Sequence, residues 1–114
     1  MTVTDTHSTQ LAPGAPMREY QDLIHRLEAY HGWLDVDLVH NCFLMGEEVG
    51  ELFSAIRKHE KLFSAGKGTT SVEHIGEEIV DVFNYLLAIA NRLDIDLESA
   101  FRRKNQQNFE RTWS

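Results

Sequence analysis

Acidic side chains recur in pairs, at helical spacing, in two segments of this 114-residue chain. The segment GEEVGEL contains Glu48 and Glu51, and the segment GEEIVD contains Glu78 and Asp81. The members of each pair stand three residues apart, which on a helix puts both carboxylates on one face, one turn apart. Four carboxylates that converge repel one another strongly, so they would either take up protons or gather cations.

The ligand type in this acidic set selects the metal. All-oxygen sites suit hard cations, so we expect Mg²⁺, with Mn²⁺ as the substitute. Such ions are held by few carboxylates together with substrate phosphates, and they polarise phosphoryl oxygens and acidify bound water. The alternative is a solvated acidic helix face, which is common for one pair alone. Two pairs, each flanking an apolar stripe and each with few compensating Lys or Arg residues, favour the metal site.

The acidic segments are expected to lie on the second and third of four helices. The first helix begins at Pro16, which suits a first helical position, and ends at Gly32. The second begins near Asp35 or Asp37 and runs to about Phe63, before a loop at residues 66–71. Cys42 lies in the apolar stripe of this second helix and reads as a buried small hydrophobe.

The third helix is expected to start with a capping box formed by Thr70 and Glu73. A wide apolar stripe follows, which indicates burial on two sides; it contains Ile75, Ile79, Val82, Leu86, Ile89 and Leu93. Asp94 or Asp96 caps a last helix. No segment shows strand alternation. The sequence therefore predicts an all-α, four-helix-type bundle in which antiparallel stripes bring the acid pairs to face each other.

Length and composition limit the remaining possibilities. Residues 1–15 read as a disordered tail and residues 16–114 as one helical domain. The net charge is −7 and there is no strong basic run, so a nucleic-acid polymer is not an expected partner. No apolar run is long enough to cross a membrane, and the N-terminus lacks the regions of a secretory signal. With one cysteine, a reducing cytoplasm is the simplest setting.

The acidic pattern also resembles a known family. Glu47-Glu48-x-x-Glu51 followed by Glu78-x-x-Asp81 resembles the MazG-like, all-α nucleoside triphosphate pyrophosphohydrolases. The segments EEVGELFSAIRK and EEIVDVFNYLLAIANRLDIDLESAFRRKNQQNFER are similar to that family's core helices and C-terminal segment, and the resemblance covers about residues 17–113.

The resemblance implies a reaction and an assembly. The family's four metal ligands carry over to Glu48, Glu51, Glu78 and Asp81. Magnesium would hold the triphosphate while an activated water attacks phosphorus, releasing a nucleoside monophosphate and pyrophosphate. Family members are homodimers or homotetramers, with pockets between helices and often between subunits. Removal of aberrant nucleotides from the pool is the role that the family suggests.

Phosphate contacts are expected on the last helix. The resemblance carries the family's Lys and Asn over to Lys104 and Asn108. By helical spacing these residues and Arg111 continue the apolar face of Leu97 and Phe101, and polar groups where a core would continue indicate a ligand. Lys104 and Arg111 would offset charge on the phosphates. The alternative is that the helix simply runs past the core into water.

The proton acceptor and the base pocket are less narrowly defined. Glu47 adjoins the motif and is a candidate general base, although its helical position equally suits a plain surface role. Trp33 and Tyr85 are candidates for stacking on a nucleotide base, with ordinary packing as the alternative. Asn41 lies two turns before Glu48 and is expected to line the same cavity.

Two rival functions remain open. A ferritin-like di-metal site needs Glu-x-x-His on two helices, and only Glu28 and His31 supply one. A non-enzymatic helical interaction module would also explain the wide stripe of the third helix, since a partner would cover it.

Overall fold

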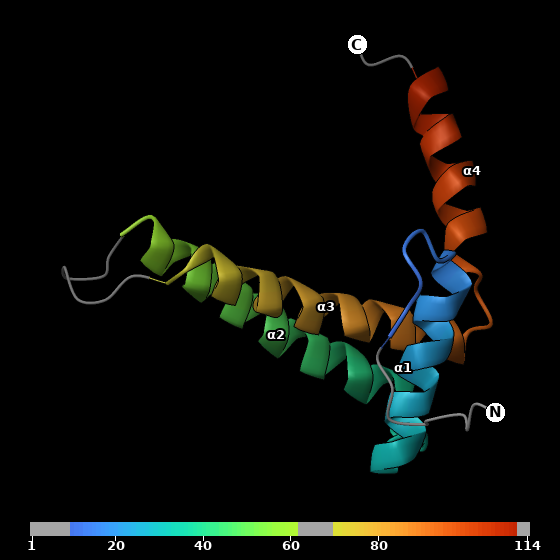
Figure 1. Ribbon diagram of the computed structural model, residues 1–114, viewed down its shortest axis with the longest axis horizontal. Helices are drawn as coiled ribbons and strands as arrows, with labels where there is room; N and C mark the ends of the chain where they lie inside the picture. Colours follow the sequence, from blue (N-terminus) through green and yellow to red (C-terminus); the bar gives the residue numbers. More distant parts are fainter. Residues whose placement is uncertain (1–9, 62–69, 112–114) are drawn as a thin grey trace. The chain divides into compact units, whose positions relative to one another are not determined.

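The computed structural model describes residues 10–61 and 70–111, which form four helices and no strand (Figure 1). The predicted all-α class is confirmed. The helices are α1 (Met17–His31), α2 (Leu38–His59), α3 (Val72–Arg92) and α4 (Leu97–Glu110). Among the described residues, no helix has the length and apolar character needed to span a membrane. Residues 1–9, most of the predicted tail, lie outside the described ranges, as does most of the predicted loop at 66–71.

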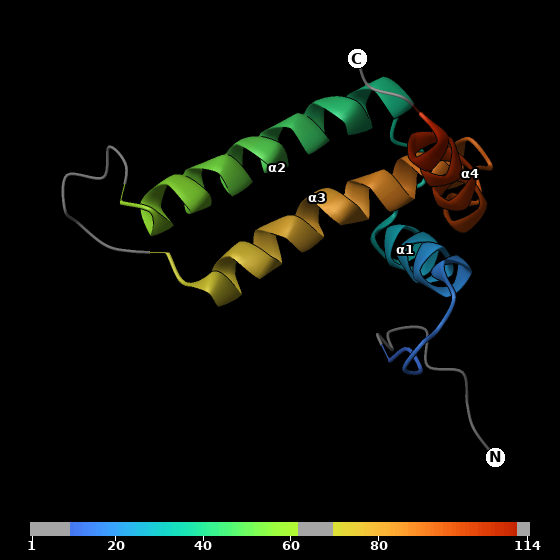
Figure 2. The same cartoon turned by 90° about the horizontal axis from the view of Figure 1, so that it is seen from above.

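The chain divides into two compact units, one formed by residues 36–89 and the other by residues 1–35 together with 90–114. In the first unit, α2 and most of α3 form an antiparallel hairpin, and Figure 2 shows the two helices running side by side. The Asp37 side chain caps α2, accepting a hydrogen bond from the backbone N–H of Val39 at 3.0 Å. Of the two predicted start residues, Asp37 is therefore the N-cap.

The end of α2 differs from the prediction. The helix stops at His59, before the predicted Phe63, and Lys61 takes a left-handed conformation with φ of 60° that turns the chain away. His59 then joins the two helices of the hairpin, because its Nδ1 donates to the backbone oxygen of Thr70 at 2.8 Å. Phe63 itself lies outside the described residues. Helix length was overestimated because apolar periodicity alone carries no information about a left-handed residue.

The cap of α3 is also displaced by one residue. The Ser71 hydroxyl accepts a hydrogen bond from the backbone N–H of His74 at 3.0 Å, which satisfies one of the unpaired donors of the first turn. Ser71, rather than Thr70, is therefore the capping side chain, and the predicted capping box between Thr70 and Glu73 is wrong. The helix itself begins at Val72, one residue later than a cap at Thr70 implies.

A buried amide organises the second unit. Gln21 of α1 has no exposed surface, and its side-chain Nε2 donates to Asn91 Oδ1 at 3.0 Å and to the backbone oxygen of Ile95 at 2.8 Å. Its Oε1 accepts from the backbone N–H of Leu97 at 3.1 Å, and Asn91 Nδ2 donates back to the Gln21 backbone oxygen at 2.9 Å. Because every polar atom of this side chain is paired, the amide specifies how α1 meets the end of α3 and the start of α4.

Residues with a left-handed backbone conformation follow the ends of α1 and α3. Gly32 has φ of 74°, and the backbone N–H of Trp33 donates to the Glu28 oxygen at 2.8 Å, which closes α1 in the expected way. Asp94, with φ of 53°, occupies the equivalent position after α3. Asp96 caps α4, since its carboxylate accepts from the backbone N–H of Ser99 at 3.1 Å. Asp94 thus terminates α3, whereas Asp96 caps the start of α4.

Few large apolar side chains are buried within the described part of the chain. The buried apolar set is small and consists of Ile24, Ala55, Leu87, Ala88 and Ala90. Much of the predicted α3 stripe stays open, with Ile79 52% and Leu86 44% exposed. The expectation that Cys42 is buried is wrong, because Cys42 lies on an exposed face of α2. Half of the residues of the stripe, Ile79, Leu86 and Leu93, are therefore exposed rather than buried.

Candidate metal centre

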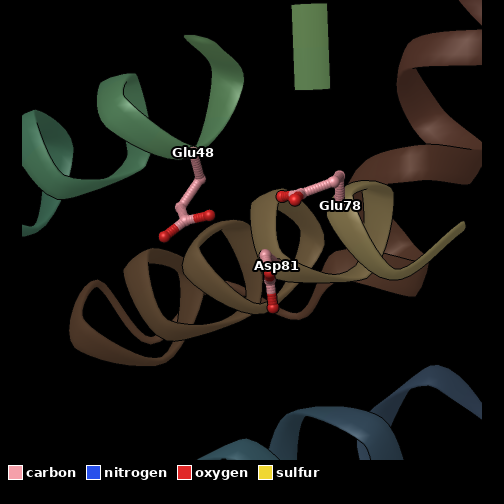
Figure 3. A group of neighbouring side chains, drawn as sticks. All are labelled: Glu48, Glu78 and Asp81. Carbon is pink, nitrogen blue, oxygen red and sulfur yellow. The ribbon is translucent and has the colours of Figure 1, made fainter. Parts of the chain in front are cut away.

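Three of the four predicted acidic side chains come together between α2 and α3. Glu48 extends from α2, and Glu78 and Asp81 extend from successive turns of α3 (Figure 3). Each offers a carboxylate oxygen, and these three oxygens all lie within 4.8 Å of one another. Two oxygens bound to one Mg²⁺ at about 2.0–2.1 Å stand at most about 4.2 Å apart, so a small approach of these side chains would let them share a cation.

The electrostatics of the cluster are those of crowded negative charges. The pKa of Glu48 is raised above its ordinary value, first because the carboxyl group is partly desolvated and then because of the charges of Asp81 and Glu78. Glu51 and Glu47 contribute smaller effects in the same direction. A raised pKa means that the ionised form of Glu48 is less favourable at this position than it is in water. A cation would reverse that penalty, because it stabilises every ionised carboxylate around it.

Glu78 is the least exposed member of an ion-pair chain at the start of α3. Its Oε1 lies 3.2 Å from Nε2 of His74, one turn earlier, and only 12% of its side chain is exposed. His74 Nδ1 lies 3.4 Å from Glu77 Oε1, but the Glu77 side chain is 71% exposed. The contact to Glu77 is therefore the weaker of the two, because water screens it. His74 was not among the residues that the sequence singled out; its position four residues before Glu78 was the available signal.

The other two acidic residues of the motif lie beside the cluster. Glu51 is exposed and does not belong to the group of three converging oxygens, although its charge helps to raise the pKa of Glu48. Glu47 is exposed as well. Glu51 stands on α2 one turn after Glu48, which is close enough for a change of rotamer to redirect its carboxylate.

The predicted base-pocket residues have different environments. Asn41, on α2 two turns before Glu48, is 3% exposed, and its side-chain Nδ2 is a buried donor with no hydrogen-bond partner. Tyr85 is half-buried on α3. Trp33 is 49% exposed in the other unit, where its ring stacks on His31 with centroids 4.3 Å apart and its backbone oxygen accepts from Arg92 at 3.0 Å. The unpaired Asn41 donor is the strongest indication of a ligand among these three.

The predicted phosphate contacts lie at the end of the chain. Lys104 is exposed on α4, and Asn108 is half-buried there, with its Nδ2 donating to Asn105 Oδ1 at 3.3 Å. Arg111 follows the last helical residue, with an extended backbone, so it does not continue the helical face as expected. These residues belong to a different unit from the carboxylate cluster.

The single Glu-x-x-His motif has a structural explanation. Glu28 is 7% exposed, and its Oε2 accepts a hydrogen bond from Arg92 at 2.9 Å in an ion pair. A carboxylate engaged with a guanidinium already has its counter-charge. His31, the other member of the motif, stacks on Trp33. This environment does not suit a ferritin-like di-metal ligand set.

Comparison with known families agrees with the geometry of the centre. The family model of the MazG nucleotide pyrophosphohydrolase domain matches residues 41–112, a range that includes the whole carboxylate cluster and α4. No curated protein and no solved structure matched the chain. The match extends over more than half of the chain and includes both acidic segments, and the chain belongs to the MazG nucleotide pyrophosphohydrolase family.

Proposed function

We propose that this protein is a Mg²⁺-dependent pyrophosphohydrolase that converts a nucleoside or deoxynucleoside triphosphate to the monophosphate and pyrophosphate. The observation that carries the proposal is the convergence of Glu48, Glu78 and Asp81 within 4.8 Å between α2 and α3. The family membership supports the class of reaction. Mg²⁺ is the first choice of ion and Mn²⁺ the second, because every available donor is a carboxylate oxygen.

The donor set fits a divalent cation. Three carboxylates crowd together, and Nε2 of His74 lies 3.2 Å from one of them, Glu78. The raised pKa of Glu48 reflects that crowding. We assign Glu48, Glu78 and Asp81 as the metal ligands and Glu51 as the fourth ligand, which would turn inward from the adjacent turn. When bound there, the ion supplies Lewis-acid chemistry, neutralising phosphoryl charge and making the attacking water more acidic.

The protein must also accept a proton from that water. In the proposed reaction, the water oxygen forms a bond to phosphorus, the anhydride bond between the α- and β-phosphoryl groups breaks, and pyrophosphate leaves. We assign the proton to a carboxylate of α2, with Glu47 as the candidate because it adjoins Glu48 and is exposed to water. Glu48 and Glu51 would contribute by holding the reacting groups in place.

The remainder of the substrate needs phosphate and base contacts. We assign Lys104, Asn108 and Arg111 to the phosphates, because two cations and an amide offset and orient the negative charge. We assign Trp33 and Tyr85 to stacking on the base or sugar and Asn41 to a hydrogen bond with it. The buried, unpaired Nδ2 of Asn41 supports this assignment, since an acceptor on the substrate would satisfy it.

We further propose that the chain acts as a homodimer or homotetramer. Large apolar side chains remain exposed on both helices of the hairpin, including Phe43 at 73% and Phe53 at 65% on α2, and Val72 at 70% on α3. Many exposed large apolar side chains indicate a protein interface, and a second copy is the occupant that a family of oligomeric enzymes suggests. A cytoplasmic location and a role in clearing aberrant nucleotides complete the proposal.

The exposed apolar surface also favours a second candidate, a non-enzymatic helical interaction module. A panel of ribo- and deoxyribonucleoside triphosphates with Mg²⁺, assayed for pyrophosphate, separates the two. The enzyme releases pyrophosphate from at least one nucleotide, and release stops on chelation. Failure to turn over any nucleotide, together with stable binding of a protein partner, would establish the module instead.

A further inference from the structure

His74 is a side chain other than an acidic one that makes a direct polar contact with the carboxylate cluster. It lies in the first turn of α3, where the Ser71 hydroxyl accepts its backbone N–H at 3.0 Å. The backbone of His74 is thereby anchored at the helix start. Its ring is half-exposed and reaches one turn forward, so that Nε2 lies 3.2 Å from Glu78 Oε1.

The contact leaves Glu78 able to bind a cation as well. A carboxylate offers two oxygens and about four acceptor positions, so a hydrogen bond from His74 leaves capacity for a cation. Figure 3 shows the Glu78 side chain directed from α3 toward Glu48. Nε2 carries a proton both in the neutral Nε2–H tautomer and in the imidazolium, so the hydrogen bond to Glu78 forms in either state.

We propose that His74 is a positioning residue, whose Nε2–H holds the Glu78 carboxylate in the orientation that binds the divalent cation. This inference rests on the metal site of the proposed function. Carboxylate ligands of metals are themselves commonly hydrogen-bonded, and their outer partners influence metal affinity strongly. A direct ligand role for His74 is disfavoured, because imidazole is a poor ligand for hard cations and its Nε2 already faces Glu78.

The test compares two variants of the full chain by direct Mn²⁺ titration without nucleotide, followed by electron paramagnetic resonance of the free ion. His74→Phe removes the donor, and we expect Mn²⁺ affinity to fall by about 10- to 100-fold. His74→Gln retains an N–H at a similar distance from the backbone, and we expect it to restore most of the affinity. His25→Phe, a matched change at an exposed histidine of α1, should bind Mn²⁺ like the wild type.

Turnover gives a second readout. If His74 acts by positioning a ligand, His74→Phe raises the Mg²⁺ concentration needed for half-maximal activity, while kcat at saturating Mg²⁺ stays near the wild-type value. Circular dichroism and thermal unfolding of the metal-free proteins establish that the fold is unchanged. If His74→Phe does not fold, His74→Ala takes its place in the same titration.

The outcomes are distinguishable. Wild-type Mn²⁺ affinity in a folded His74→Phe protein would overturn the role of His74 and leave the metal site intact. Equal losses in His74→Phe and His74→Gln would show that the hydrogen bond is not the cause, which also overturns it. If the wild-type chain binds no Mn²⁺, the proposed metal site itself is wrong and the role of His74 falls with it.

Discussion

Glu48 on α2 and Asp81 on α3 place carboxylate oxygens within 4.8 Å of each other, although they are distant in sequence. Asp81 is also the strongest charge acting on Glu48, whose pKa is raised first by burial and then by that neighbour. Two like charges held this close destabilise the metal-free fold and favour cation binding. The arrangement therefore couples the stability of the fold to the binding of the metal.

Removing the charge of Asp81 should weaken metal binding without weakening the fold. We expect Asp81→Asn to lower Mn²⁺ affinity by more than about 100-fold, because a ligand should matter more than an outer partner. The metal-free variant should be as stable as the wild type or more so, since repulsion on Glu48 is relieved. Isothermal titration calorimetry and thermal unfolding measure the two effects. Glu73→Gln, at an exposed acidic position in the first turn of α3, is the matched control and should alter neither. Lower stability in Asp81→Asn would contradict the account of repulsion.

Glu51 offers a sharper test of the fourth ligand, because it stands outside the converging oxygens. We expect Glu51→Gln to abolish turnover with Mg²⁺, as Asp81→Asn does, if the side chain turns inward when the ion binds. A variant that keeps wild-type activity would limit the ligand set to Glu48, Glu78 and Asp81. Steady-state pyrophosphate release as a function of Mg²⁺ concentration decides between the two ligand sets.

Asn41 should show opposite effects on stability and on substrate binding. Its buried Nδ2 has no partner, and an unsatisfied buried donor costs about 1–3 kcal/mol. We therefore expect Asn41→Leu to raise the free energy of unfolding in urea or leave it unchanged, while KM for the nucleotide increases. Asn84→Leu, on α3, serves as the control for nucleotide KM. A destabilised Asn41→Leu protein with an unaltered KM would assign the amide a purely structural role.

The exposed part of the apolar stripe of α3 predicts that turnover depends on the association of several copies of the chain. Ile79 is 52% exposed, and a lysine there would place a charge in any interface built on the stripe. We expect Ile79→Lys to shift the protein toward the monomer in analytical ultracentrifugation and to reduce turnover. Gln107→Lys, at an exposed polar position of α4, should leave the assembly unchanged. A wild-type chain that is monomeric at all accessible concentrations would refute the oligomer outright.

The carboxyl group of Asp96 makes the stability of the folded chain decrease in acid. Its pKa is lowered from 3.8 in the folded chain, mainly by hydrogen bonds from Ser99 and additionally by Arg18, whose Nη2 lies 3.2 Å away. A lowered folded pKa adds stability that is present above 3.8 and lost as the pH falls through the folded value. Asp96→Asn keeps a capping oxygen without the charge, so it should be less stable than the wild type at neutral pH. The two unfolding curves should converge in strong acid; a constant difference across the pH range would contradict this.

Local chemistry determined which parts of the structure were predictable. Helical periodicity located the bodies of all four helices. Gly32 and Asp37 lie at the helix ends where the backbone freedom of glycine and the acceptor oxygen of aspartate predict them, because capping is a property of a few neighbouring residues. Lys61 and Asp94 were missed as helix ends, since left-handed backbone at a non-glycine residue leaves little trace in sequence.

Long-range features were harder to infer. The i,i+3 spacing of Glu78 and Asp81 was enough to place them together, but the distance of Glu51 from the cluster depends on its rotamer, which spacing does not determine. The expected burial of Cys42 was wrong because an apolar stripe identifies a face without saying which part of it a neighbour covers. The contact of His74 with Glu78 follows the i,i+4 spacing of a helix, a signal that was present in the sequence and was not used.

The most direct test of the central claim follows the phosphorus itself. Phosphorus NMR of the purified chain with Mg²⁺ and a panel of nucleoside triphosphates distinguishes cleavage after the α-phosphoryl group from loss of the γ-phosphoryl group. We predict that at least one nucleotide yields monophosphate and pyrophosphate, that the reaction stops with a chelator and resumes with added Mg²⁺, and that Asp81→Asn is inactive. Unchanged nucleotides throughout, or equal turnover by Asp81→Asn, would contradict the claim that these carboxylates bind the catalytic ion.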